Sequence, residues 1–263
     1  MKVKKVTVID LQNVYFAYDD KVILEDINIP VEAGDFTALI GPNGAGKTTL
    51  FNMLTGESGP SSGTITLYTA DGPVDITKKK AYQVAKLGVA RTFQNIRLFG
   101  DLTVYDNILT ACQKNIHYNF FQGILHTKKC KEYENTMVSI CNKVLDDVGL
   151  THYKNQKANN LPYGMQRRLE IARALVTNPK LLLLDEPAAG MNEEESDSLS
   201  YFIKEIQDKN DITVIIIDHH MDVIMKICDR ISVLNFGTLL AEGVPKEIQS
   251  NNEVIEAYLG VDE

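Results

Sequence analysis

The feature that most constrains this chain is the stretch Gly41-Pro42-Asn43-Gly44-Ala45-Gly46-Lys47-Thr48, which fits the pattern G-x-x-x-x-G-K-[ST]. With average residue usage, chance would place this pattern in a chain of this length roughly 1% of the time. An apolar run, Phe36 to Ile40, precedes it, and Lys47 to Leu54 has a helical pattern. Glycines in such a turn let backbone N–H groups cradle phosphate oxygens, and the start of the helix adds its positive dipole end.

The loop therefore predicts a nucleotide site in which Lys47 bonds the β- and γ-phosphates and Thr48 ligates Mg²⁺. The alternative is a glycine-rich turn without a ligand. Such a turn has no need of a lysine followed by a threonine.

A second motif, Leu181 to Glu186, is an apolar run that ends in two carboxylates. Ligands of open α/β sheets bind at the carboxyl ends of strands, so both acids are expected to face the nucleotide. Asp185 is the candidate for the Mg²⁺ side, acting through water, and Glu186 for orienting and deprotonating the attacking water. The alternative is a solvated acidic turn after a strand.

Composition and charge limit the class of protein. The 263 residues are 44% hydrophobic and 24% charged, as in soluble globular proteins, and the net charge of −8 disfavours nucleic-acid binding. The longest purely apolar runs have four residues, whereas a membrane-spanning helix needs about 20. No secretory segment is recognised at the N-terminus, so we expect a cytosolic protein. The cysteines form no CxxC pair and are expected to be reduced packing residues.

The hydrophobic pattern predicts a mixed α/β core with a helical insertion. Strands are expected at 6–16, 23–31, 36–40, 64–68, 89–93, 181–184, 214–217, 231–234 and 238–241, and helices at 47–54, 193–207 and 253–259. Between residues 102 and 148 the spacing of apolar residues is helical, and a further helix has the apolar stripe Met165, Leu169, Ala172 and Val176. Residues 1–93 and 178–263 are thus predicted to form the core, and residues 94–177 a helical subdomain.

Six stretches in this order resemble the ATP-binding subunits of ABC transporters. They are Tyr18 upstream of the loop, the Walker A loop Gly41 to Thr48, the Q-loop Gln94, the signature Leu161 to Arg168, the Walker B strand Leu181 to Glu186, and the switch histidine His219. The resemblance covers nearly the whole chain. It implies a P-loop NTPase core with an antiparallel β subdomain and an inserted helical subdomain that carries the signature.

The resemblance also implies roles for individual residues. Glu186, His219 and Gln94 would act in catalysis, and Thr48, Gln94 and Asp185 at Mg²⁺. The residues that would bind ATP are Tyr18, Gly41, Pro42, Asn43, Gly44, Ala45, Gly46, Lys47, Thr48, Thr49, Tyr163, Gly164 and Met165.

The signature departs from the common Leu-Ser-Gly-Gly-Gln form. Pro162 replaces the serine, Tyr163 the first glycine and Met165 the glutamine. Because proline offers neither a hydroxyl nor an N–H, phosphate contacts here would rest on Gly164 and the N-terminus of the following helix. Asn192 stands where an aspartate usually follows Walker B.

These departures, with the segments 91–99, 188–192 and 254–260, resemble the ATPases of branched-chain amino acid importers. The implied partners are separate integral membrane permease subunits and a second ATPase subunit, in a homodimer or heterodimer that sandwiches two ATP molecules, with no nucleic acid. The implied location is peripheral, on the cytoplasmic face of the inner membrane. The alternatives are the ATPase of a urea/amide importer or of a lipopolysaccharide-type exporter, and a soluble ABC-type ATPase of DNA repair or translation.

Some of these residues have simpler interpretations. Tyr18 is also compatible with a strand-edge aromatic and Gln94 with a surface glutamine. His219 and His220 are unsuited to ligating one metal together, because neighbours on an extended segment point to opposite faces; His219 is preferred for the switch role from the resemblance alone. The run Glu193 to Glu195 is expected in the first turn of a helix, where negative charge is favourable.

Overall fold

The computed structural model describes residues 6–112 and 128–259. The chain divides into two compact units, one built from the segments up to Arg91 and from Lys180 onward, the other from Thr92 to Pro179. We call them the core unit and the helical unit and describe each by itself.

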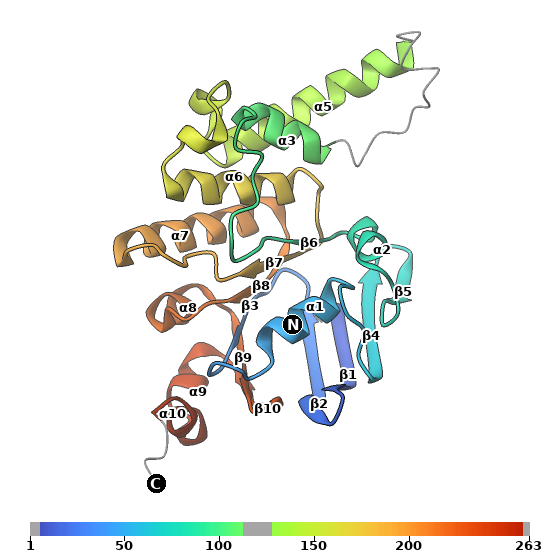
Figure 1. Cartoon of the computed structure of the whole chain (residues 1–263), viewed down its shortest axis with the longest axis vertical. Coiled ribbons are helices and arrows are strands. Elements are labelled where there is room, and N and C mark those ends of the chain that lie inside the picture. Colours follow the sequence, from blue (N-terminus) through green and yellow to red (C-terminus); the bar gives the residue numbers. More distant parts are fainter. Residues whose placement is uncertain (1–5, 113–127, 260–263) are drawn as a thin grey trace, which may run out of the picture. The chain divides into compact units, whose positions relative to one another are not determined.

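A six-stranded sheet of order β10-β9-β3-β8-β7-β6 forms the centre of the core unit (Figure 1). β6, β7, β8, β3 and β9 run parallel, and β10 is antiparallel to β9. β3, β7 and β8 are buried along their whole length because their residues are almost all apolar. The strands span Phe36–Ile40 (β3), Val89–Arg91 (β6), Leu181–Asp185 (β7), Thr213–Ile217 (β8), Arg230–Asn235 (β9) and Thr238–Gly243 (β10).

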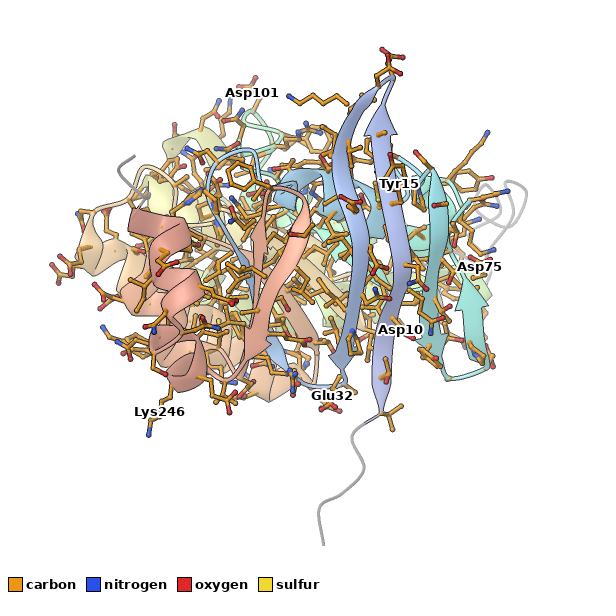
Figure 2. The ribbon with its side chains drawn as sticks, turned by 90° about the horizontal axis from the view of Figure 1, so that it is seen from below. Asp10, Tyr15, Glu32, Asp75, Asp101 and Lys246 are labelled. Atoms are coloured by element: carbon orange, nitrogen blue, oxygen red, sulfur yellow. The ribbon has the colours of Figure 1, made fainter. Side chains whose placement is uncertain are left out.

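The second sheet of the core unit is antiparallel, with the order β2-β1-β4-β5. Figure 2 shows its long strands side by side, with Tyr15 and Asp10 along β1 and Glu32 at the end of β2. Its strands alternate between buried and exposed residues, as expected of a sheet with one solvated face. They span Thr7–Tyr18 (β1), Lys21–Glu32 (β2), Ser62–Thr69 (β4) and Gly72–Asp75 (β5).

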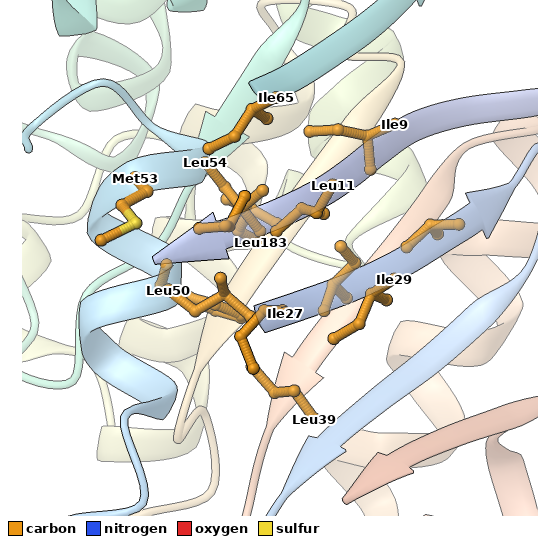
Figure 3. Packing of buried hydrophobic residues seen from close by; sticks show 14 of the residues in the cluster. Ile9, Leu11, Ile27, Ile29, Leu39, Leu50, Met53, Leu54, Ile65 and Leu183 are labelled. Atoms are coloured by element: carbon orange, nitrogen blue, oxygen red, sulfur yellow. The ribbon is translucent and has the colours of Figure 1, made fainter. Parts of the chain in front are cut away.

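Helix α1, Lys47–Leu54, packs into one apolar cluster with both sheets. Leu50 and Leu54 of α1 point toward Leu11 and Ile27 of the antiparallel sheet (Figure 3), and Met53 belongs to the same cluster. Leu39 and Leu183 bring the central sheet into the same cluster. Because α1 begins at Lys47, this packing fixes the position of the loop that precedes it.

The other helices of the core unit are α2 (Ala81–Lys86), α7 (Glu193–Asn210), α8 (Met221–Ile227), α9 (Pro245–Gln249) and α10 (Asn252–Leu259). α7 begins with the three glutamates Glu193 to Glu195, as predicted. Asn192 is its N-cap: its side chain accepts the N–H of Glu195 at 2.9 Å, and the Glu195 carboxylate accepts the N–H of Asn192 at 3.2 Å. An asparagine at this position thus serves as a helix cap.

Among the described residues, the helical unit contains α3 (Val104–Cys112), α5 (Lys128–Asp147) and α6 (Tyr163–Leu175), with 3-10 turns at Thr151–Tyr153 and Ala158–Asn160. α3 packs against both α5 and α6 (Figure 1). Asn107 of α3 is buried, and its amide binds the backbone of the segment before the helix, accepting from the N–H of Phe99 and donating to its carbonyl, both at 3.0 Å. The segment that follows Gln94 is therefore held to α3.

The predicted elements within the described residues are present, and several of their ends differ from the predicted positions; residues 113–127 of the predicted helical stretch 102–148 lie outside the described residues. The predicted strand 89–93 stops at Arg91, and the predicted helix 193–207 continues to Asn210. β5, α2, α8 and α9 were not predicted, because each is too short for a hydrophobic period to be recognised. All four cysteines are buried and reduced, as expected. Within the described ranges, every helix is too short or too polar to span a bilayer.

Candidate nucleotide site

The Gly41–Thr48 loop joins β3 to α1 and depends on three glycines in left-handed or extended positive-φ conformations. Their φ angles are 149° at Gly41, 82° at Gly44 and 99° at Gly46. A Cβ at Gly41 would lie 2.1 Å from the carbonyl oxygen of Leu234, and one at Gly46 would lie 2.5 Å from a methyl carbon of Leu24. A Cβ at Gly44 would meet no described atom within 4 Å. Gly41 and Gly46 are therefore required by the fold, whereas Gly44 leaves open space beside the loop.

Lys47 stands at the first position of α1 with its side chain folded over the loop. Its Nζ donates to the carbonyl oxygens of Gly41 at 2.7 Å and Pro42 at 3.0 Å. Burial lowers the pKa of Lys47, and the charge of Glu186 raises it in part. An ammonium group held in this position by two neutral carbonyls is placed to exchange them for phosphate oxygens.

Glu186 follows the last residue of β7 and has a left-handed backbone, with φ of 45°. Such a conformation costs about 1–3 kcal/mol in a residue other than glycine and is common at functional sites. The N–H of Glu186 donates to the carbonyl of Ile217 at 2.8 Å, which ties the ends of β7 and β8 together. The Glu186 Oε1 lies 3.0 Å from the His219 Nε2. The predicted base and the predicted switch histidine are thus in contact.

Asp218 contacts the backbone of both adjacent histidines, His219 and His220, and the ring of His220. Its Oδ1 accepts the backbone N–H groups of His219 at 2.7 Å and His220 at 3.0 Å, and lies 2.7 Å from the His220 Nδ1. The His220 ring is therefore turned toward Asp218, while the His219 ring is turned toward Glu186. Local backbone hydrogen bonds thus select the histidine that faces the predicted base.

Asp185, the last residue of β7, forms a buried ion pair with Arg91, the last residue of β6. The Arg91 Nη2 lies 2.7 Å from the Asp185 Oδ2, and its Nη1 donates to the Asn52 side chain of α1 at 2.8 Å. The two charged side chains are only 7% and 9% exposed. Arg91 therefore fixes the carboxylate relative to α1 and supplies its counter-charge.

Replacing Arg91 with methionine should lower the free energy of unfolding by about 3–5 kcal/mol, because Asp185 would remain buried without a partner charge. The matched control is Arg230→Met, since Arg230 pairs with Glu242 at 3.0 Å but its side chain is 37% exposed. That control should cost at most about 1 kcal/mol. Urea denaturation measures both variants, and equal losses would contradict a special role for the Arg91 pair.

One cavity of about 1240 Å³ joins the parts of this site within the core unit. The loop residues Pro42 to Thr49, Glu186 and His219 all line it. Thr48 and Thr49 stand on the same wall as Lys47, in the first turn of α1. The loop, Glu186 and His219 therefore face one space, whereas Asp185 does not line this cavity.

Two further walls of this cavity were not predicted. Phe236, at the turn between β9 and β10, lines it and is 91% exposed, and Glu253 and Glu256 of α10 line it as well. The hydroxyl of Tyr258, also on α10, receives a backbone hydrogen bond from Gly41; burial raises the pKa of Tyr258, and this bond lowers it in part. The phenylalanine in the turn sequence Asn-Phe-Gly was a sequence signal that could have predicted the Phe236 wall. No sequence signal pointed to the acids of α10.

Tyr18 ends β1 and is 63% exposed, with its ring edge-to-face against Phe16 at a centroid distance of 4.7 Å. It does not line the cavity, although Lys21, three residues further along the chain, does. The position is consistent with either of its predicted interpretations, a base contact or a strand-edge aromatic.

The helical unit holds Gln94 and the signature. Pro162 is the N-cap of α6, and Tyr163, Gly164 and Met165 form the first turn of that helix. A Cβ at Gly164 would meet no described atom within 4 Å, and its φ is not positive. Within this unit, neither backbone conformation nor packing requires a glycine at residue 164.

Comparison with known protein families decides the identity of this arrangement. Residues 24–189 match the family model described as ABC transporter. This match spans the loop, Gln94, the signature and both acids. The chain belongs to the ABC transporter ATP-binding family. A second model, described as Branched-chain amino acid ATP-binding cassette transporter, matches residues 238–263 of this ABC protein.

Curated relatives and solved structures agree with this assignment. The ABC protein is 40% identical to the high-affinity branched-chain amino acid transport ATP-binding protein BraF of Pseudomonas aeruginosa, over 96% of this chain and 98% of that protein. It is 42% identical to the corresponding LivG protein of Escherichia coli K12, over 90% and 91% of the two chains. The crystal structure of the ADP conformation of MJ1267, an ATP-binding cassette of an ABC transporter, matches with a TM-score of 0.82, 30% identity and coverage of 97% and 100%. The predicted ABC ATPase fold is thereby confirmed.

Proposed function

We propose that this chain is the ATP-hydrolysing subunit of an ABC transporter that imports branched-chain amino acids. The observation that carries the ATPase assignment is the single cavity lined by the Walker A loop, Glu186 and His219. The solute class is supported by the match of residues 238–263 to the branched-chain model and by the relatives named for that transport.

The residues of the core unit have the chemistry for hydrolysis. Lys47 would exchange the carbonyls of Gly41 and Pro42 for phosphate oxygens, and the N–H groups at the start of α1 would bind the same anion. Glu186 would accept a proton from the attacking water, with His219 holding its carboxylate at 3.0 Å. Tyr18 and Thr49 are proposed as further contacts to ATP.

A magnesium ion suits the donor set at this site. The Thr48 hydroxyl and the Asp185 carboxylate are oxygen donors of the type that Mg²⁺ prefers, and Gln94 is proposed as a third. The ion would supply charge neutralisation on the phosphates. Arg91 orients the Asp185 carboxylate and supplies its counter-charge in the chain as it stands.

The open space at Gly164 supports a contact with a second ATPase subunit. Because nothing in the helical unit requires a glycine there, we attribute it to the approach of a ligand from outside the chain. In the proposed dimer, Tyr163, Gly164 and Met165 of one subunit would meet the nucleotide held by the Walker A loop of the other. Membrane permease subunits would be the remaining partners and would hold the ATPase at the inner face of the membrane.

The variant Gly164→Ala tests this dimer. It should leave the free energy of unfolding unchanged or raise it by up to about 1 kcal/mol, because alanine favours a helix and has room. It should nevertheless prevent ATP-dependent dimerisation when combined with Glu186→Gln, as measured by light scattering after gel filtration. Ser139→Ala, an exposed change on α5, is the matched control. A Gly164→Ala protein that dimerises as the control does would contradict the sandwich.

Transport itself is tested by co-purification and reconstitution. The chain should co-purify with integral membrane proteins from detergent-solubilised membranes, and proteoliposomes of that complex should accumulate labelled leucine only with ATP present. Glu186→Gln is the matched inactive complex. Association with ribosomes or DNA, and with no membrane protein, would overturn the transporter assignment.

A further inference from the structure

The helical unit contains a buried arginine whose bonds join two motifs that lie far apart in the sequence. Arg167 of α6 is 2% exposed. Its guanidinium donates to the carbonyl of Phe93 at 2.9 Å, to the carbonyl of Gln94, and to the hydroxyl of Tyr163 at 3.0 Å; it also pairs with Glu170 at 3.0 Å. One side chain thus holds both the Q-loop backbone and the first residue of the signature helix.

The same face of α6 continues this contact along the Q-loop segment. The Glu170 carboxylate accepts the N–H of Arg97 at 3.4 Å, and Arg173 donates to the carbonyl of Arg97. The Arg173 guanidinium also lies over the ring of Phe99, 5.0 Å from its centroid. Residues three apart on a helix are neighbours on its surface. Arg167, Glu170 and Arg173 therefore all contact the segment 93–99, and we call these three residues the clamp.

Packing alone does not explain a charged clamp. Burial raises the pKa of Glu170, and the Arg167 charge lowers it in part. The Arg167–Glu170 pair is therefore formed at a cost in desolvation. Apolar side chains of similar volume often replace a buried ion pair without loss of stability. What an apolar side chain lacks is the set of fixed N–H donors that bind two loop carbonyls and a hydroxyl in a defined geometry.

We propose that Arg167 is a positioning residue that couples Gln94 to the signature, with the Tyr163 hydroxyl as its contact at the N-terminus of α6. Displacement of the Q-loop then moves the first turn of α6 with it. This explains the departure at residue 163, because a glycine there has no group to bind Arg167. The inference rests on the proposed roles of Gln94 and the signature in ATP hydrolysis.

The test is a double-mutant cycle on ATP hydrolysis by the full chain. Tyr163→Phe removes only the hydroxyl bond at a partly exposed residue. It should lower kcat roughly three- to tenfold, the effect of losing one typical hydrogen bond, whereas a change in KM for ATP with kcat unaltered would place the hydroxyl on the nucleotide and overturn the positioning role. Gln94→Ala should lower kcat as well. Because the clamp acts through Gln94, the double variant should be no slower than Gln94→Ala alone.

Three further proteins complete the design. Arg167→Lys keeps the charge beside Glu170 but loses the planar set of donors, so its kcat should fall below that of Tyr163→Phe. Tyr201→Phe, at an exposed tyrosine of α7, is the matched control and should keep the wild-type kcat. Glu186→Gln reports on the proposed function: normal turnover in that variant would reject the ATPase mechanism itself.

The inference has its own contrary outcomes. A wild-type kcat in Tyr163→Phe would overturn it, as would a double variant whose losses multiply. A Gln94→Ala protein with normal turnover would do so too, because the clamp would then have nothing to position. If Arg167→Lys fails to fold, the double-mutant cycle of Gln94→Ala and Tyr163→Phe still tests the inference.

Discussion

Glutamine in place of Glu186 is expected to lower ATP turnover by about a hundredfold or more, the usual contribution of a general base, while ATP binding is retained. The reason is geometric: the carboxylate lines the cavity of the phosphate-binding loop and contacts His219 at 3.0 Å. The amide is nearly isosteric but accepts no proton. Turnover is measured as phosphate release at saturating ATP, and binding as the fluorescence of a labelled ATP analogue.

The matched control for this change is Glu205→Gln, which makes the same replacement at an exposed residue of α7. Its turnover should equal that of the wild type. If Glu186→Gln retained wild-type turnover, the carboxylate would have no role as the base, and a different residue of the cavity would have to activate water.

Alanine in place of Lys47 should weaken ATP binding by about 3 kcal/mol, which is roughly a hundredfold in Kd. The lysine is buried at the loop, and its Nζ already lies within hydrogen-bond distance of two loop carbonyls. Removing it deletes the one side-chain cation that the motif directs at the phosphates. Equilibrium binding of ATP measures the loss.

Lys246→Ala, an exposed lysine of α9, is the control that removes the same charge outside the cavity. Both variants should be compared at two ionic strengths, because a loss caused only by net charge shrinks as salt increases. Equal affinities for ATP in the two variants would remove Lys47 from the phosphate site.

Much of the fold followed from short-range patterns. The buried strands β3, β7 and β8 were predicted within one residue at each end, because each is a run of apolar residues with a distinct boundary. The helix after the loop was predicted at Lys47–Leu54, where it is found. The short helices α8 and α9 were missed, since one or two turns give no hydrophobic period.

The candidate site divides in the same way. The Walker A loop, both acids and His219 were predicted from motif and resemblance. Arg91 and Arg167 were not, although both stand in the quoted motifs. Arg167 lies off the apolar stripe of its helix, which predicts an exposed side chain, yet it is buried.

The sequence by itself determined the order of elements, the phosphate-binding loop and the pair of acids, because glycine conformation, helix capping and strand burial depend on neighbours in the chain. Only the tertiary structure decided which charged and polar groups meet: Arg91 with Asp185, Glu186 with His219, and Arg167 with the Q-loop carbonyls. An arginine carries the same charge wherever it stands, and packing brings Arg91 to a carboxylate 94 positions away and Arg167 to carbonyls 74 and 73 positions away.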